Sequence, residues 1–159
     1  RSGALDMAKK SIVLLKNDEA LLPLKKQGQT IALIGPLAAD KTSPLGNWRI
    51  AGENNSAVSV LEGMLKYGGN TIIHEQGVKL VNEIPAFHKE VDINTSDKSG
   101  IKAATSVAKN ADVVVMVLGE YGFQSGEGRS RSKLDLPGFQ QELLEEVYAV
   151  NNNIWLYTL

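Results

Sequence analysis

The feature that most constrains the fold of this sequence is a run of six apolar residues, Val113 to Leu118, enclosed by Asp112 and Gly119. A short apolar run that is rich in β-branched residues and ends at a turn residue is typical of a strand buried on both faces. Such strands occur mainly in parallel sheets, because helices cover both faces of those sheets. The run therefore favours an α/β fold.

Helical and strand patterns alternate along the remainder of the chain. Apolar spacing predicts helices over residues 4–15, 57–67, 98–110 and 139–148, and short apolar runs predict strands over residues 30–34, 70–74 and 154–159. Residues 79–97 show no sustained periodicity, and we expect them to form an excursion on the surface. The alternation of strands and helices predicts an α/β protein, specifically a three-layer α/β/α sandwich around a mainly parallel sheet.

Candidate core positions recur at helical spacing in the first two predicted helices: Ala4, Met7, Ala8, Ile12 and Leu15 in one, and Val58, Leu61 and Leu65 in the other. We expect residues 1–24 to form a lead-in helix and linker, and residues 25–159 to form the sandwich domain. The chain begins with Arg1 and ends in an apolar run. We therefore expect a domain that is incomplete at its C-terminus and that belongs to a longer protein.

Composition limits the classes of partner and site. The 159 residues, 43% hydrophobic and 22% charged, are ordinary for one globular domain with a core. The net charge of −1 gives no electrostatic reason to expect nucleic acid or an anionic membrane as partner. The absence of Cys excludes disulfides and thiolate zinc sites. No apolar run in the sequence is long enough to span a membrane.

Familiar cofactor motifs are also missing. Gly35 follows a predicted strand, but the second and third glycines of a dinucleotide motif do not follow it, and no Gly-Lys-Ser/Thr sequence exists. His74 and His88 are the only histidines and do not have the spacing of a metal site. We expect neither a metal nor a cofactor. Asn54 and Asn94 begin Asn-x-Ser sequons, which would matter only in a secreted eukaryotic protein.

A long polar loop follows the apolar run and is the best candidate for a functional site. It contains several glycines together with Glu120, Glu127, Arg129 and Arg131. In open parallel sheets, chemistry collects on loops at the carboxyl ends of strands, and long ordered loops are usually functional. A carboxyl group on such a loop can work as a general acid/base if a partner covers it. A solvated charge is the simpler interpretation of each Glu.

Trp48 lies in a second polar region, among Asn, Arg and Gly residues. Two interpretations are equally good from the sequence. A Trp side chain is often buried in a core, and it can equally stack on a sugar ring from an exposed loop.

Several motifs resemble the second domain of glycoside hydrolase family 3 enzymes, in the β-glucosidase-like branch. The similar stretches are residues 8–17 (AKKSIVLLKN), 21–24 (LLPL), 31–36 (IALIGP), 46–48 (GNW), 59–63 (SVLEG), Gly119-Glu120, Gly126-Glu127, Ser130-Arg131 and 134–140 (LDLPGFQ). Together they extend through nearly the whole chain. The least similar part is residues 79–97.

The resemblance implies a retaining β-glucosidase-like enzyme built from two domains. In that family a (β/α)₈ barrel carries an Asp nucleophile, and an α/β sandwich supplies the acid/base Glu, which the resemblance places at Glu127. Glu120, Arg131 and Trp48 would support the site or contact the substrate. The Ser-Asp-Trp context of the nucleophile is absent from this sequence, so we expect this chain to be inactive without its barrel. Family habit implies a periplasmic or secreted enzyme.

Two other functions remain compatible with the sequence. The chain would be a sugar-binding module without catalysis if it bound sugars in the absence of the barrel. It would be a purely structural domain if it only stabilised the barrel. Its partners under the first interpretation are a β-glucoside or oligosaccharide substrate and the N-terminal barrel domain of the same longer protein.

Overall fold

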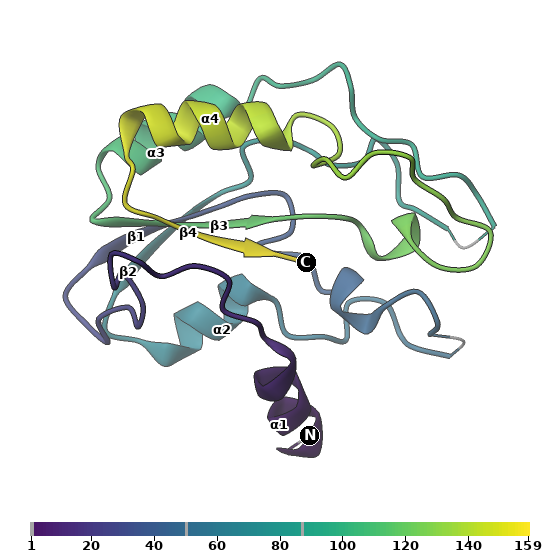
Figure 1. Cartoon of the computed structure of the whole chain (residues 1–159), viewed down its shortest axis with the longest axis horizontal. Helices are drawn as coiled ribbons and strands as arrows, with labels where there is room; N and C mark the ends of the chain where they lie inside the picture. Colours follow the sequence, from purple (N-terminus) through teal and green to yellow (C-terminus); the bar gives the residue numbers. More distant parts are fainter. Residues whose placement is uncertain (1, 50, 87) are drawn as a thin grey trace.

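The centre of the molecule is a four-stranded parallel sheet, seen in a computed structural model that describes residues 2–49, 51–86 and 88–159. Its strands are β1 (Thr30–Ile34), β2 (Thr71–Glu75), β3 (Val113–Leu118) and β4 (Ile154–Thr158), in the order β2-β1-β3-β4. The helices are α1 (Ser2–Ser11), α2 (Val60–Tyr67), α3 (Ile101–Lys109) and α4 (Gln140–Val150). Helices α3 and α4 cover one face of the sheet and α2 lies against the other (Figure 1). The predicted α/β/α sandwich is therefore confirmed.

Strand β3 is buried on both faces, as its sequence predicts. Every residue from Val113 to Leu118 is at most 1% exposed. Val114, Met116 and Leu118 pack with α3 and α4, whereas Val115 and Val117 pack with residues of β1 and the α2 side. The alternation of side chains along one strand thus joins two cores through a single element.

Helix α2 begins three residues later than its apolar pattern predicts. Ser59 caps the helix: its side chain accepts a hydrogen bond from the Glu62 amide, and the Glu62 carboxylate accepts one from the Ser59 amide. Val58 therefore precedes the helix and is 60% exposed, and Leu65 is 57% exposed. The predicted core face was wrong for these two residues, because the apolar stripe that packs consists of Val60, Leu61 and Met64.

Helix α1 ends at Ser11, four residues earlier than predicted, and all of its residues are exposed. The apolar residues that follow are exposed as well, from 60% at Ile12 to 88% at Leu15. Figure 1 shows α1 set apart from the sheet and its covering helices. The predicted apolar face of this helix exists in the sequence but packs against no core of the described chain.

Residues 79–97 contain neither helix nor regular strand in their described part, but they are more than a surface excursion. Leu80 is 4% exposed and joins the core on the α2 side. Asn94 is fully buried, and its side chain donates hydrogen bonds to the carbonyls of Lys79 and Asp97. Asn94, the first residue of a sequon, thus has a structural role, because its side chain joins the two ends of this segment.

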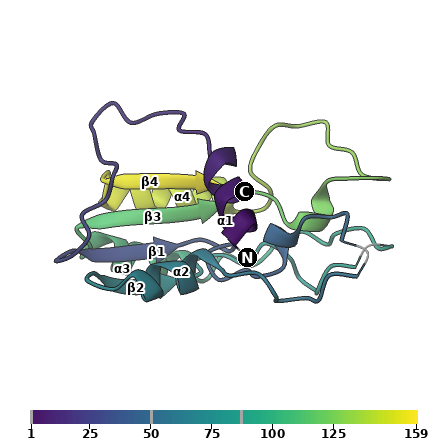
Figure 2. The ribbon, with the colours of Figure 1, turned by 90° about the horizontal axis from the view of Figure 1, so that it is seen from below.

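The carboxyl ends of all four strands meet at one edge of the sheet, because the strands are parallel. The long connections 35–59, 76–100 and 119–139 extend from this edge, on the right of Figure 2. Gly119 ends β3 with φ +138°, and a Cβ there would meet the backbone of Leu159 on the neighbouring strand. Only glycine allows the chain to leave β3 at this close approach.

Candidate functional site

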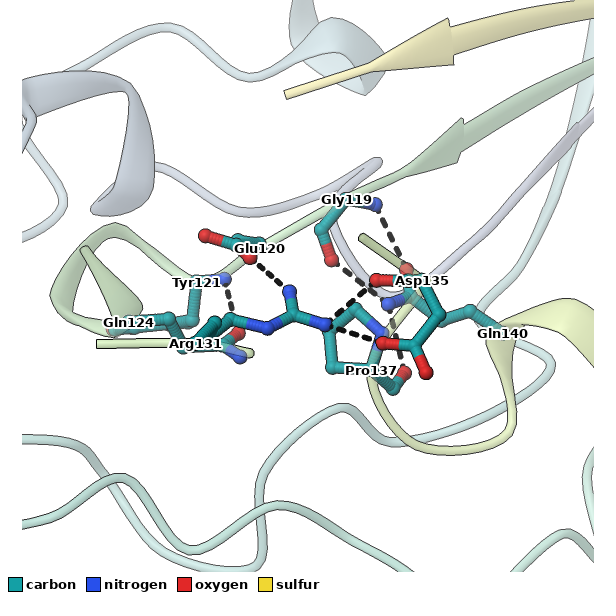
Figure 3. A network of polar contacts seen from close by, with 8 residues as sticks. All are labelled: Gly119, Glu120, Tyr121, Gln124, Arg131, Asp135, Pro137 and Gln140. Atoms are coloured by element: carbon teal, nitrogen blue, oxygen red, sulfur yellow. Dashed lines mark hydrogen bonds and ion pairs between the residues drawn. The ribbon is translucent and has the colours of Figure 1, made fainter. Parts of the chain in front are cut away.

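The loop after β3 is closed at its base by the side chain of Gln140, the first residue of α4. Gln140 is fully buried. Its Oε1 accepts a hydrogen bond from the Gly119 amide at 2.9 Å, and its Nε2 donates to the carbonyls of Gly119 (2.8 Å) and Pro137 (3.0 Å), as Figure 3 shows. One amide side chain therefore joins the end of the strand to the start of the helix, and residues 120–138 form a loop with a fixed base.

Arg131 connects two carboxylates within this loop. Its Nη1 forms an ion pair with Oε1 of Glu120, and its Nη2 contacts Oδ1 of Asp135 at 2.6 Å and the Asp135 carbonyl at 2.7 Å (Figure 3). The Arg131 side chain is only 26% exposed. Of the predicted site residues, the structure thus brings Glu120 and Arg131 together.

Tyr121 follows Glu120 and packs with the core on the α2 side. Burial raises the pKa of its phenol, and the Asp40 carboxylate raises it further, against an opposing effect of Arg49. A hollow of about 550 Å³ lies beside Tyr121, between the segments 36–40 and 79–85. Tyr121 is therefore the one residue of the β3 loop among the described residues that line this hollow.

Glu127 lies at the exposed tip of the loop. The Arg129 amide donates a hydrogen bond to the Gly126 carbonyl at 3.1 Å, so Glu127 and Gly128 are the central residues of a turn. Within the described residues, the Glu127 carboxylate has no hydrogen-bond or ion-pair partner. It is free to meet a group outside this chain.

Trp48 is 66% exposed, so its interpretation as a core residue was wrong. It belongs to the loop after β1, which runs beside the tip of the β3 loop: the side-chain amide of Asn47 donates to the Ser125 carbonyl at 2.5 Å. Trp48 and Glu127 therefore flank a direct contact between two loops.

A second hollow, of about 350 Å³, lies beside residues 123–131 of the loop. It is lined by residues 128–131, Phe123, Gln124, and Glu90, Val91 and Ile93 of the segment after β2. The guanidinium of Arg129 donates to the carbonyls of Ala86 and Lys89 across this region. Three connections from the carboxyl edge of the sheet thus meet around residues 119–131.

Metal ligands do not gather anywhere in the described residues: they contain no group of three or more His, Asp or Glu side chains placed to hold an ion. The ring of His74 contacts the Leu33 carbonyl at 2.9 Å through Nδ1, which gives it a structural role. No helix within the described chain has the length and apolarity needed to cross a membrane.

Sequence reasoning missed Gln140 and Asn47 as parts of this arrangement. Each lies within a stretch that supports the family resemblance, but neither has a charge or an ionisable group to mark it. The pairing of residue 47 with residue 125 depends on the order of β1 and β3 in the sheet, which local patterns do not reveal.

Comparison with known proteins gives a consistent result. Residues 12–158 match the family model described as the glycosyl hydrolase family 3 C-terminal domain. The chain is 35% identical over 165 residues to the periplasmic beta-glucosidase of Salmonella typhimurium, covering 98% of this chain and 21% of that protein. It is 38% identical over 159 residues to a beta-xylosidase of Formosa agariphila, covering 97% of this chain and 20% of that protein.

Solved structures agree with the sequence comparison. The GH3 beta-glucosidase of Bifidobacterium adolescentis superposes with a TM-score of 0.68 at 31% identity, over 92% of this chain and 19% of that chain. The chain therefore spans about one fifth of the length of the relatives it matches.

Proposed function

Because this chain belongs to glycosyl hydrolase family 3 as its C-terminal domain, we propose that it is the second domain of a retaining β-glucosidase-like enzyme and supplies Glu127 as the general acid/base. The substrates are β-glucosides or β-xylosides, in line with the named activities of the relatives. The nucleophile comes from a (β/α)₈ barrel in the same longer protein. No cofactor takes part.

One observation carries this assignment. Glu127 is the carboxylate that the fixed loop presents to the outside, whereas Glu120 on the same loop is paired with Arg131. A general acid must reach the glycosidic oxygen of a bound substrate. A carboxylate held by a guanidinium is less suited to this task, and it serves instead to orient the loop.

The mechanism then has two steps. Glu127 in its acid form protonates the leaving oxygen while the barrel carboxylate attacks the anomeric carbon, which gives a covalent glycosyl intermediate. The Glu127 carboxylate next removes a proton from water, which releases the sugar with retained configuration. This requires the two carboxyl groups to lie roughly 5–5.5 Å apart.

Trp48 has a supporting role in this proposal. Its exposed ring belongs to the loop that runs beside the loop of Glu127. An exposed indole offers an apolar face on which a sugar can stack. The chain alone is inactive, because a general acid without its nucleophile loses covalent catalysis and most of the substrate positioning. The enzyme is periplasmic or secreted, as the name of the Salmonella relative suggests.

The test is the effect of the leaving group on a Glu127→Ala variant of the longer enzyme. We expect kcat/KM for cellobiose to fall by about 10²–10⁴-fold, because its leaving group needs a proton. For a dinitrophenyl glucoside, whose leaving group is already good, kcat/KM falls much less. Equal losses for the two substrates would refute the assignment.

The exposure of Trp48 also favours a second candidate, a sugar-binding module without catalysis. Titration of the chain with glucose or cellobiose, followed by Trp fluorescence, separates the two functions. Saturable binding by the chain alone, with a loss of affinity in Trp48→Ala that is measured by calorimetry because this variant lacks the fluorescent reporter at position 48, supports the binding module. An unchanged signal supports a site that is completed only by the barrel.

A further inference from the structure

Three side chains from the loop after β1 contact residues 122–125 in the first part of the loop after β3. Ser43 Oγ accepts a hydrogen bond from the Gly122 amide at 3.0 Å, and the Arg49 guanidinium lies 4.8 Å from the centroid of the Phe123 ring. Asn47 lies between them in sequence and contacts Ser125. The two loops are therefore joined from residue 122 to residue 125, the residue before the turn that carries Glu127.

Asn47 makes the last of these contacts and the one nearest to Glu127. Its Nδ2 donates to the Ser125 carbonyl at 2.5 Å. Gly126 has φ +110°, and a Cβ there would meet the side-chain amide of Asn47. The Asn47 amide thus occupies the space beside Gly126 that a side chain would otherwise fill, and it fixes the peptide that enters the turn.

The turn has one backbone hydrogen bond of its own, from the Arg129 amide to the Gly126 carbonyl, and its two glycines make it depend on further support. Gly126 and Gly128, which flank Glu127, both have positive φ values of +110° and +72°. Glycine has many accessible backbone conformations, so the direction of Glu127 depends on what holds the two ends of the turn. Asn47 holds the entry, and Arg129, which donates to the carbonyls of Ala86 and Lys89, holds the exit.

We propose that Asn47 is a positioning residue for Glu127. Through Asn47, the loop after β1, which carries Trp48, and the loop after β3, which carries Glu127, move as one unit. This inference rests on the acid/base role proposed above for Glu127. A carboxyl group displaced by about 1 Å from its productive position costs about 10²-fold in rate. The loss of one hydrogen bond at the entry of a glycine-flanked turn is sufficient to allow such a displacement.

The first test uses the chain itself and limited proteolysis. Asn47→Asp keeps the shape of the side chain but replaces the donor by an acceptor that faces the Ser125 carbonyl. Asn54→Asp introduces the same charge at an exposed position of the same loop. We expect trypsin to cleave the 119–139 loop about fivefold faster in Asn47→Asp, as the loss of one hydrogen bond predicts, and at the original rate in Asn54→Asp. Equal cleavage of both variants would overturn the proposal.

The second test measures kinetics in the longer enzyme. We expect Asn47→Asp to lower kcat/KM for cellobiose by about 10²-fold and to change kcat/KM for a dinitrophenyl glucoside much less. A variant that only reduces the folded fraction would lower both values equally. The double variant Asn47→Asp/Glu127→Ala should show the same difference in kcat/KM between the two substrates as Glu127→Ala alone, because the double variant has no Glu127 carboxyl group left to position.

The outcomes separate the two proposals. If Glu127→Ala shows the leaving-group dependence and Asn47→Asp lowers kcat/KM equally for both substrates, the positioning role is wrong and the acid/base assignment stands. If Glu127→Ala itself shows no such dependence, both proposals fail. Full additivity of the two substitutions also contradicts the positioning role.

Discussion

The side chain of Gln140 uses both of its polar atoms to hold the base of the loop that carries Glu127. Each atom is buried and paired, with the amide and carbonyl of Gly119 and the carbonyl of Pro137. A buried polar group that loses its partner costs more free energy than the hydrogen bond contributes when it is intact. The contribution of this residue to folding should therefore exceed that of an exposed glutamine.

Gln140→Glu should destabilise the chain by about 1–3 kcal/mol or more, because a carboxylate oxygen would replace the donor that faces two carbonyls. Urea unfolding followed by circular dichroism measures the change. Gln141→Glu is the matched control: it lies one residue further along α4, is exposed, and should change the free energy of unfolding by no more than about 0.5 kcal/mol. Equal effects of the two substitutions would show that the loop base is not held by Gln140.

The sequence singles out residues that carry charge more readily than neutral ones. Glu120, Glu127 and Arg131 were named for this reason; the structure pairs the first with the third, and the role of Glu127 stays a prediction. Trp48 remained ambiguous because an indole suits both a core and an exposed sugar platform. Asn47 and Gln140 were missed because their partners are distant in sequence, 78 and 21 residues away.

Helix α2 is the element whose start depends most clearly on a local interaction. The pKa of Glu62 is lowered by the hydrogen bond from Lys41 and by the one from the Ser59 backbone. A carboxyl group whose pKa is lowered by folding stabilises the native state above its unfolded pKa, and this contribution is lost as pH falls through the folded pKa. The cap of α2 therefore weakens in acid.

Glu62→Gln removes this titration while keeping a side chain that can accept the Ser59 hydrogen bond. We expect the wild-type chain to be more stable than the variant at neutral pH, and the difference in free energy of unfolding to shrink as pH falls below the ordinary range of a Glu carboxyl. Urea unfolding across that pH range provides the measurement. A difference that is constant with pH would exclude Glu62 as the titrating group.

Elements were predicted best where burial on both faces or strong alternation leaves little choice. Strand β1 and strand β3 have the predicted bounds. Helix ends were less predictable. The start of α2 depends on its cap at Ser59, and α1 ends at Ser11 although the apolar spacing continues to Leu15. The role of Asn94 in residues 79–97 was not visible because this segment has no periodic pattern.

At the scale of the whole molecule, large apolar side chains remain exposed on several elements. They include Leu5, Met7 and the residues at 12–15, and Leu156 on β4, which lies at an edge of the sheet. An uncovered strand edge recruits other strands, and contiguous apolar patches mark interaction surfaces. In the proposed enzyme, the barrel would cover part of this surface.

The isolated chain should therefore self-associate. Light scattering over a concentration series should show an apparent mass that rises with concentration. Leu156→Lys, which places a charge on the exposed side of the edge strand, should lower the association. A mass that stays at the monomer value over the whole series would contradict this expectation.

The three-layer architecture was predictable because it follows from alternation of elements and from the burial of β3. The order β2-β1-β3-β4 was not, because nothing in a local pattern specifies which strands are neighbours. That order brings the loops after β1 and β3 together. The arrangement of these loops therefore depends on the whole fold, even though Glu120, Glu127 and Arg131 stand out individually in the sequence.

The proposed acid/base role of Glu127 is tested most directly by adding azide to the Glu127→Ala variant of the longer enzyme. An anionic nucleophile needs no general base, so azide should accelerate breakdown of the glycosyl intermediate and yield a β-glycosyl azide, detectable by nuclear magnetic resonance. Glu120→Ala should lower activity without this product. Formation of the azide by Glu120→Ala and not by Glu127→Ala would contradict the account.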